Sequence, residues 1–267
     1  MAKLILSLSV IAAAAVVVVG ATTAFFNDTE TSTGNVFTAG SIDLTVDSFG
    51  ATYNSLDIET AGTTWTARDL TDQKFFTFED IKPGDYGTRH ISVHADDNPA
   101  WACLLVTNKE DEENDLNDAE EDAGDNTEGS GELSKYISVF GWQDDDSNGK
   151  YDPNDDETPL KIQGDPDFDL LSFFDVFYDL DIADSQSETD PLEPTGGAST
   201  RNIGIAWCVG TQTVNHDTGA ISCDGNSVQD DAQSDSFSAD VVLYAEQVRN
   251  NPNFKCSDVE LGGVGPV

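Results

Sequence analysis

Residues 101–107 read WACLLVT, a nearly continuous apolar run near the middle of the chain. Short apolar runs of this kind are typical of strands that are buried on both faces, as in the core of a β-sandwich. We therefore expect residues 101–107 to form a central strand of such a fold.

Several other segments carry strand patterns. Apolar and polar residues alternate in residues 36–46 and again in residues 88–94, which follow a Pro83-Gly84 turn. In such a turn proline presets its own φ and glycine supplies a positive one. Similar patterns mark residues 75–78, 136–142, 202–208 and 237–247. Many short strands with turn signals, and no regular alternation with helices, predict an all-β, jelly-roll-like β-sandwich with long acidic loops.

One short helix is also expected, in residues 167–180. Asp167 is a suitable N-cap for it. Near-helical spacing would gather on one face Leu170, Phe173, Phe174, Phe177 and Leu180. The same residues suit a pair of aromatic strands, and the pattern leaves both alternatives open.

Acidic residues dominate the charge of the chain. It has 51 Asp and Glu residues against 12 Lys and Arg, giving a formal net charge of −39. Nucleic acid is therefore not expected as a partner, since phosphate contacts need Lys and Arg. Three explanations of the acidity stay open: solubility in concentrated salt, which the scarcity of lysine favours, binding of divalent cations, or simply a solvated face.

Much of this charge lies in residues 108–132, which hold 12 acidic residues and one lysine. Such a segment repels itself and has little to bury, so we expect a mobile surface loop inserted between strands. We also expect residues 257–267, rich in glycine, to be a flexible tail. The chain as a whole is not disordered in character, because 38% of its residues are hydrophobic and 14 are Phe.

The first 24 residues have the layout of a secretory signal. Lys3 precedes an apolar run of 16 residues, 4–19, and small residues follow as far as Ala24. The run is shorter than the roughly 20 residues that cross a bilayer as a helix. We therefore expect residues 1–24 to be removed during export. This would leave one secreted or cell-surface domain, residues 25–267, with no stable membrane span.

Four cysteines in an exported chain favour disulfides. Cys208 and Cys223 flank a polar, turn-rich segment between two candidate hairpin strands, which makes them one expected pair. Cys103 would then pair with Cys256 and tie the C-terminal segment to an early strand. Four cysteines allow three connectivities, and free thiols are the remaining alternative.

Short motifs occur in order at both ends and in the middle of the chain. Near the N-terminus are residues 25–29 (FFNDT) and 35–44 (NVFTAGSIDL), and a turn motif follows at residues 81–85 (IKPGD). The C-terminal half adds residues 204–208 (GIAWC), 220–225 (AISCDG) and 250–256 (NNPNFKC). Together these motifs resemble the TasA/camelysin family of secreted proteins.

The resemblance implies a maturation route and an assembly. Members of that family are cut by an ER-type signal peptidase, here between Ala24 and Phe25, and the best-known members are subunits of extracellular matrix fibres. Their fibres form when a strand near the new N-terminus completes the sandwich of a neighbouring copy, giving a head-to-tail homopolymer. An ordinary signal followed by an ordinary first strand is the alternative.

The corresponding donor strand in this chain is residues 25–44. Its apolar side chains would fill pockets of a neighbour or the chain's own core: Phe25, Phe26, Val36, Phe37, Ile42 and Leu44.

Residues 144–155 (DDDSNGKYDPND) carry the ligand spacing of an EF-hand calcium loop, with glycine at position 6 and a carboxylate at position 12. The expected ligands of Ca²⁺ are Asp144, Asp146, Asn148, the carbonyl of Lys150, Asp152 and Asp155. Asp155 is shorter than the usual glutamate, Glu157 lies two residues further on, and flanking helices are not expected. A solvated acidic turn is the alternative.

No catalytic site is expected. The camelysin branch has been described as a metallopeptidase, but the histidines are His90, His94 and His216, and no HEXXH motif is present. On a strand His90 and His94 would share a face about 13 Å apart, too far for one zinc ion. We expect both to be exposed strand residues.

The sequence therefore favours a structural subunit of an extracellular filament or biofilm matrix. The second hypothesis is a monomeric, calcium-stabilised adhesion or surface-layer module whose N-terminal strand folds into its own sheet. A camelysin-like metallopeptidase is the third.

Overall fold

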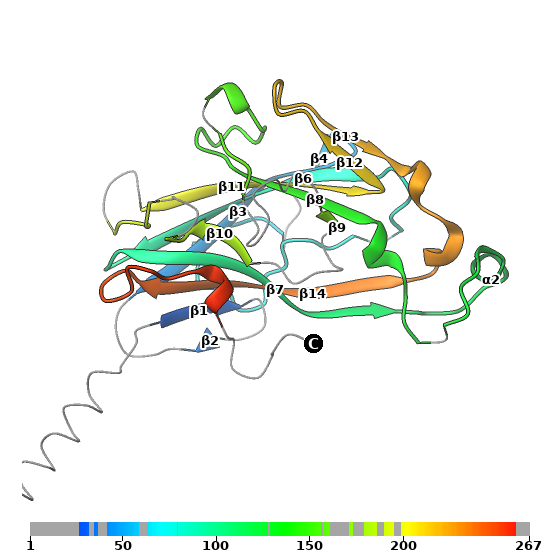
Figure 1. Ribbon diagram of the computed structural model, residues 1–267, viewed down its shortest axis with the longest axis horizontal. Helices are drawn as coiled ribbons and strands as arrows, with labels where there is room; N and C mark the ends of the chain where they lie inside the picture. The colour runs from blue at the N-terminus through cyan, green and yellow to red at the C-terminus, as the bar shows by residue number, and fades with distance from the viewer. Residues whose placement is uncertain are drawn as a thin grey trace, which may run out of the picture.

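Two antiparallel β-sheets packed face to face form the protein, as Figure 1 shows for the computed structural model. The all-β sandwich predicted from the sequence is confirmed. The structure describes residues 27–31, 35–36, 42–58, 63–78, 80–127, 129–155, 157–160, 171–172, 179–185, 190–194 and 199–259. It describes the backbone alone for residues 27–31, 35–36, 171–172 and 179–181.

The first sheet has five strands and is built around two long ones. β7 (Ala100–Glu112) and β14 (Ser236–Gln247) pair along most of their length, and β10 (Asp179–Ala183) lies on the other side of β7. β1 (Asn27–Thr31) pairs with the outer side of β14, and β2 (Asn35–Val36) pairs with β1. The two N-terminal strands therefore form one side of this sheet, with β2 at its edge.

The second sheet has seven strands, four of them long. The long strands follow the order β3 (Asp43–Tyr53), β6 (Tyr86–Asp96), β11 (Thr200–Val209) and β8 (Ile137–Gln143). Short strands extend it at β3 and at β8, namely β4 (Leu56–Asp57), β5 (Trp65–Arg68) and β9 (Leu171–Ser172). A separate hairpin is formed by β12 (Thr211–Val214) and β13 (Ile221–Asp224).

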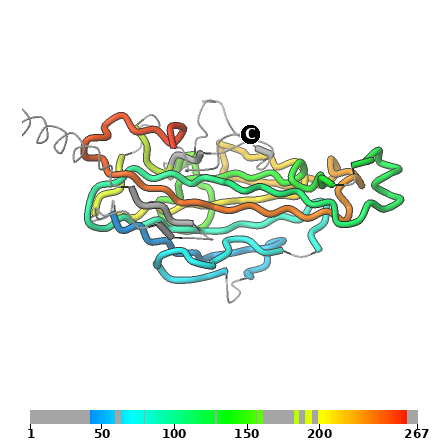
Figure 2. Tube along the Cα trace, turned by 90° about the horizontal axis from the view of Figure 1, so that it is seen from below, coloured from blue at the N-terminus to red at the C-terminus, as the bar shows by residue number. Residues whose placement is uncertain are grey.

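The chain crosses repeatedly between the two sheets. It passes from β6 to β7, back to β8, over to β10, and back to β11 before it ends in β14. Figure 2 shows the long strands lying side by side along the length of the molecule. This alternation between layers is the jelly-roll-like arrangement expected from the sequence.

The main core lies between the sheets and follows the two-residue alternation of the strands. Its most deeply buried members include Leu44, Val46, Ile91, Val93, Leu104, Ile203 and Leu243. Burying a side chain of this size contributes roughly 1.5–3 kcal/mol relative to leaving it exposed. The run at residues 101–107 lies in β7, which pairs with strands on both sides, so the predicted central strand is confirmed.

Both predicted disulfides are formed. Cys208 bonds Cys223 and ties the end of β11 to the β12–β13 hairpin. Cys103 bonds Cys256 across 153 residues of sequence. This bond lies on the outer face of the first sheet, where a small second core also contains Leu105, Val242 and Tyr244.

The short helix is not where the sequence predicted it. The described parts of residues 167–180 are strands, because Leu171–Ser172 pairs with β8 and residues 179–180 begin β10 beside β7. The helical prediction is therefore wrong at those residues, and the other residues of 167–180 lie outside the described part. Pairing with a neighbouring sheet overrode the local spacing of the apolar residues.

The α-helix of the described chain is α2 (Asp118–Ala123), inside the acidic segment. Asn117 caps it by accepting bonds from Ala119 and Glu120, and the Glu120 carboxylate in turn accepts from the Asn117 N–H. Single 3-10 turns occupy Leu133–Tyr136, Pro153–Asp155, Gly225–Ser227, Asp230–Ala232 and Cys256–Asp258.

The acidic segment 108–132 is therefore not one surface loop, which corrects the expectation from its composition. Its first five residues belong to β7, because β14 pairs with that strand as far as Glu112. Its later residues include three buried carboxylates, those of Glu120, Asp125 and Glu132. Charge density alone missed this because it says nothing about which acids accept hydrogen bonds.

The expected signal, residues 1–24, lies outside the described residues. Of the expected tail, residues 257–258 complete a 3-10 turn anchored by Cys256, and residues 260–267 lie outside the described part. In the portion of the chain that is described, no helix is both long and apolar enough to cross a membrane.

Replacing Gly204 by alanine tests the packing of the second sheet. Gly204 lies directly opposite Trp142, and an added Cβ would lie 2.1 Å from the Trp142 ring, which is fully buried. We expect Gly204→Ala to lower the free energy of unfolding by about 1–3 kcal/mol, measured by urea denaturation. Gly129→Ala is the matched control, since nothing lies within 4 Å of its added Cβ. Equal stability of the two variants would contradict the analysis.

Candidate functional site

The loop that follows β8 covers the outer face of the second sheet. Its floor is a small apolar cluster formed by Phe140, Trp142, Tyr151 and Ala206. Tyr151 comes from the loop itself and packs edge-on against Phe140, with 5.0 Å between the ring centroids. The Tyr151 side chain thus anchors the loop of residues 144–155 to the sheet.

Asp144 begins the loop and is fully buried. One of its carboxylate oxygens lies 2.9 Å from His90 Nδ1, on strand β6, which β11 separates from β8. The Asn148 and Gly149 N–H groups also donate to this carboxylate, at 3.2 and 3.3 Å. These contacts turn the loop back on itself at its first residue.

Gly149 is the residue that allows this turn. Its φ is +81°, and an added Cβ would lie 2.6 Å from His90 Nε2. A side chain here would meet both a strained backbone and a buried imidazole. The glycine at position 6 of the calcium pattern therefore has the role that the pattern gives it.

Three carboxylates meet at the mouth of the loop. Oxygens of Asp144, Asp146 and Glu157 all lie within 4.8 Å of one another. Calcium binds oxygens at 2.3–2.6 Å, so oxygens on opposite sides of one ion are separated by about this distance. The group could therefore hold a divalent cation with hard oxygen ligands.

The structure brings together part of the predicted ligand set. Asp144 and Asp146 are in the group, but the third carboxylate belongs to Glu157 and not to Asp152 or Asp155. Asp155 is exposed in the 3-10 turn Pro153–Asp155. Glu157 is 4% exposed and returns to the sheet just before Leu160 donates to the Gly141 carbonyl. The only sequence signal for this ligand was the presence of a glutamate two residues after position 12 of the calcium pattern.

The remaining predicted ligands make hydrogen bonds within the loop. Asn148 directs its amide nitrogen to Asp146 at 2.6 Å, and its amide oxygen accepts from the Lys150 N–H at 2.7 Å. Asp152 accepts from the Asn154 N–H at 3.0 Å. Their assignment as Ca²⁺ ligands remains a prediction.

Two carboxylates of this group, Glu157 and Asp144, have shifted pKa values. Burial, then the nearby Asp144 and Asp146, raise the pKa of Glu157 to about 7. Burial would also raise the pKa of Asp144, but the hydrogen bonds from His90 and Gly149 outweigh it and leave that pKa lowered. Two carboxylates this close need a proton or a cation between them, which is the chemical property of the site.

The histidines differ from the prediction. Both lie on β6 as expected, but His90 is 3% exposed and His94 is only half-buried, bonded to Thr200 and Asp47. The expectation that both are exposed is wrong because the 144–155 loop covers the outer face of β6. Among the described residues, no group of three or more close His, Cys, Asp or Glu side chains includes a histidine.

The predicted donor strand divides into two parts. Phe25, Phe26 and Phe37 lie outside the described residues, and Val36 belongs to β2. Ile42 and Leu44 are buried in the chain's own main core, the second of the two places expected for them. Leu44 belongs to β3, which pairs with β6 of the same chain, and the donor role of residues 25–44 stays a prediction.

No protein-family model matches the chain, and a search of curated proteins finds no match. The resemblance to the TasA/camelysin family therefore rests on the motifs themselves. The function must be argued from the two features just described, the acidic loop and the N-terminal strand.

Glu157→Gln tests the electrostatics of the loop. Folding raises the pKa of Glu157. The stabilisation that its protonated form provides is therefore fully present below the ordinary pKa of 4.5 and is lost as pH rises through about 7. Glutamine mimics the protonated form. Without divalent cations we therefore expect the variant to exceed the natural protein in unfolding free energy by about 1–3 kcal/mol near pH 8, and to equal it near pH 4. Urea denaturation in a chelator gives the comparison, and a difference independent of pH would contradict it.

Proposed function

We propose that the protein is a structural subunit of an extracellular filament or biofilm matrix, assembled by exchange of its N-terminal strand after removal of residues 1–24. The motifs that resemble the TasA/camelysin family support this proposal, as does the place of β1 in the sheet. Two disulfides suit an oxidising, extracellular setting.

The observation that carries the proposal is the pairing of β1. This strand contributes five residues, opposite Val242–Glu246 of β14, and the two-residue β2 beside it is the edge strand of the first sheet. An equivalent β1 from another copy could make the same main-chain bonds to β14. Exchange of an identical element costs little, because the bonds broken in one subunit form again in the next.

The rest of the fold does not need to change during such an exchange. β3 begins at Asp43, and its side chains Leu44 and Val46 are held in the core. The exchanged segment would therefore end before Ile42, and residues 32–41 would connect it to the body. Each subunit would give one strand and accept one, which produces a head-to-tail chain.

Charge sets the condition under which subunits can meet. A formal charge of −39 repels neighbouring copies strongly in dilute buffer. At about 1 M salt the Debye length falls to about 3 Å, which leaves only close contacts between charges significant. Assembly is therefore expected to need concentrated salt, in keeping with a saline habitat.

A cysteine pair distinguishes exchange from folding back. Asn27 lies directly opposite Glu246 in the ladder, and the described chain has no free cysteine. In oxidised filaments of Asn27→Cys/Glu246→Cys protein we expect a ladder of covalent multimers on non-reducing gels. The reason is that each new disulfide would join two subunits.

The two single variants are the controls and should give at most dimers. If the double variant forms only an internal disulfide in material that scatters light as a polymer, strand exchange is refuted. If the processed protein stays monomeric at every salt concentration, the filament proposal fails as well.

The acidic loop favours a second candidate, a monomeric calcium-stabilised adhesion or surface-layer module. In that case β1 stays in its own sheet and Ca²⁺ bound at Asp144, Asp146 and Glu157 fixes the loop over β6 and β8. Light scattering separates the two functions, since only filament growth depends on protein concentration. A metallopeptidase has less support, because histidine is absent from the close ligand groups in the described part.

Calcium dependence tests this second candidate. A hundredfold excess of CaCl₂ over its Kd should raise the melting temperature by about 5–10 °C, measured by calorimetry. We expect Asp146→Asn to reduce this rise, since it neutralises a carboxylate of the group. Asp155→Asn is the matched control and should retain it, because Asp155 is exposed and outside the group. Equal shifts in both variants, or with MgCl₂ at the same ionic strength, would contradict a specific site.

A further inference from the structure

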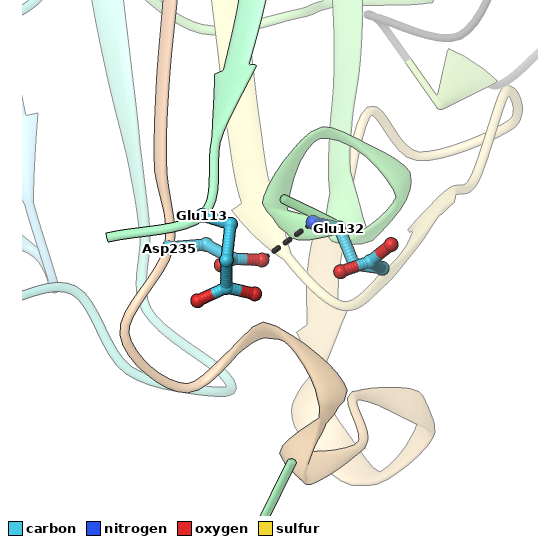
Figure 3. Close-up of side chains that lie close together, drawn as sticks. All are labelled: Glu113, Glu132 and Asp235. Atoms are coloured by element: carbon cyan, nitrogen blue, oxygen red, sulfur yellow. Dashed lines mark hydrogen bonds between the residues drawn. The ribbon is translucent and has the colours of Figure 1, made fainter. Parts of the chain in front are cut away.

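A second group of carboxylates lies near the start of strand β8, whereas the 144–155 loop follows the end of that strand. Figure 3 shows Glu113, Glu132 and Asp235, which come from three separate segments. Glu113 follows β7, Glu132 precedes the 3-10 turn Leu133–Tyr136, and Asp235 precedes β14. One oxygen from each lies within 4.8 Å of the others.

The chain is shaped to bring these residues together. The Glu132 N–H donates to Asp235 Oδ2, the bond drawn in Figure 3. Next to it, Gly131 approaches so closely that an added Cβ would lie 2.8 Å from Asp235 Cγ. Glu120 of helix α2 adds a brace, because its carboxylate accepts from the Ser234 N–H at 2.9 Å. Main-chain N–H groups therefore help to hold these carboxylates in place.

A fourth carboxylate, that of Asp125, lies against this group. Asp125 is 6% exposed, and its Oδ1 accepts from the Thr127 N–H at 2.9 Å and from the Thr127 hydroxyl. Its charge adds to the influences that raise the pKa of Glu113, Glu132 and Asp235, after the larger effect of burial. Three carboxylates thus converge, and a fourth acidic side chain lies beside them.

Several of the oxygens of these four side chains are buried and have no hydrogen-bond partner. They are Glu113 Oε2, Asp125 Oδ2, Glu132 Oε2 and Asp235 Oδ1. Glu132 and Asp125 are each more than nine-tenths buried. An unpaired buried carboxylate oxygen is costly, and four together are more so because their charges repel.

The positive charge of Lys135 does not compensate these unpaired oxygens. Lys135 Nζ lies 3.3 Å from Glu132 Oε1, the oxygen that is already engaged, and about half of the lysine side chain is exposed. Burial is the largest influence on Glu113, Glu132 and Asp235, and it raises the pKa of each. These carboxylates must therefore either share protons or bind a cation.

We propose that Glu113, Asp125, Glu132 and Asp235 form a second divalent-cation site, which takes Ca²⁺. Oxygens of three of these carboxylates converge, and each of the four has a buried oxygen without a hydrogen-bond partner. All the donors are hard oxygens, which suit Ca²⁺ and Mg²⁺ and not the softer transition metals. Calcium is preferred because it accepts irregular carboxylate geometry, whereas Mg²⁺ demands a near-ideal octahedron.

An ion at this site would connect three parts of the chain that are far apart in sequence. It would tie the end of β7 and the acidic segment to the start of β14. The acidic segment would then be fixed to the sheet by metal ligation in addition to hydrogen bonds. The site is independent of strand exchange, because β1 pairs with the other end of β14.

Hydrogen-exchange mass spectrometry of the purified protein tests the proposal. We expect CaCl₂ to slow exchange at least about tenfold in peptides covering residues 113–132 and 233–237, with a smaller effect of MgCl₂ at equal ionic strength. In Glu132→Gln/Asp235→Asn protein this protection should be lost. Both substitutions keep the side-chain shape, and asparagine retains an oxygen that can accept from the N–H of residue 132.

Matched controls separate this site from its surroundings. Asp118→Asn/Asp122→Asn removes the same charge from exposed positions of α2 and should keep the protection. Asp146→Asn, in the 144–155 loop, should also keep it, so failure of that loop as a calcium site leaves this result unaffected. No calcium-dependent protection in the natural protein would overturn the proposal and indicate proton-bridged carboxylates. Protection that persists in Glu132→Gln/Asp235→Asn would overturn it as well.

Discussion

The ladder between β7 and β14 is the constraint on which the functional features depend. One end of β14 accepts β1, opposite Val242–Glu246, and the other end begins beside Asp235 and the second acidic group. Cys103 lies opposite Tyr244, at the end of the ladder that accepts β1, and its disulfide holds the C-terminal segment. A break in this pairing would therefore disturb the N-terminal strand, the acidic segment and the C-terminus together.

The large negative charge is organised and is not spread evenly over the surface. Some carboxylates cap turns and helices, as Glu120 does for α2 and Ser234. Others gather in two partly buried groups, beside Asp144 and beside Asp235. Repulsion within these groups opposes folding unless protons or cations intervene. The acidity thus has local consequences that the net charge does not reveal.

Strand positions and disulfides were predictable from sequence because each rests on a strong local signal. The apolar run at residues 101–107 can be satisfied only by burial, and the cysteines paired as their positions in strands suggested. The carboxylate groups were less predictable. Glu157 and Asp235 join their partners through returns of the chain that no short pattern encodes. The helix was misplaced because aromatic spacing at residues 167–180 suits a strand equally well.

The Cys103–Cys256 bond has a mechanical consequence. It closes a covalent ring that contains both β7 and β14, so residues between the two cysteines cannot be drawn out by a pull on the chain. In a filament under tension, force would enter each subunit through the linker before β3 and leave through the ladder on β14. Only the part of the chain ahead of Cys103 could unravel. Extension of each subunit would therefore stop at the disulfide.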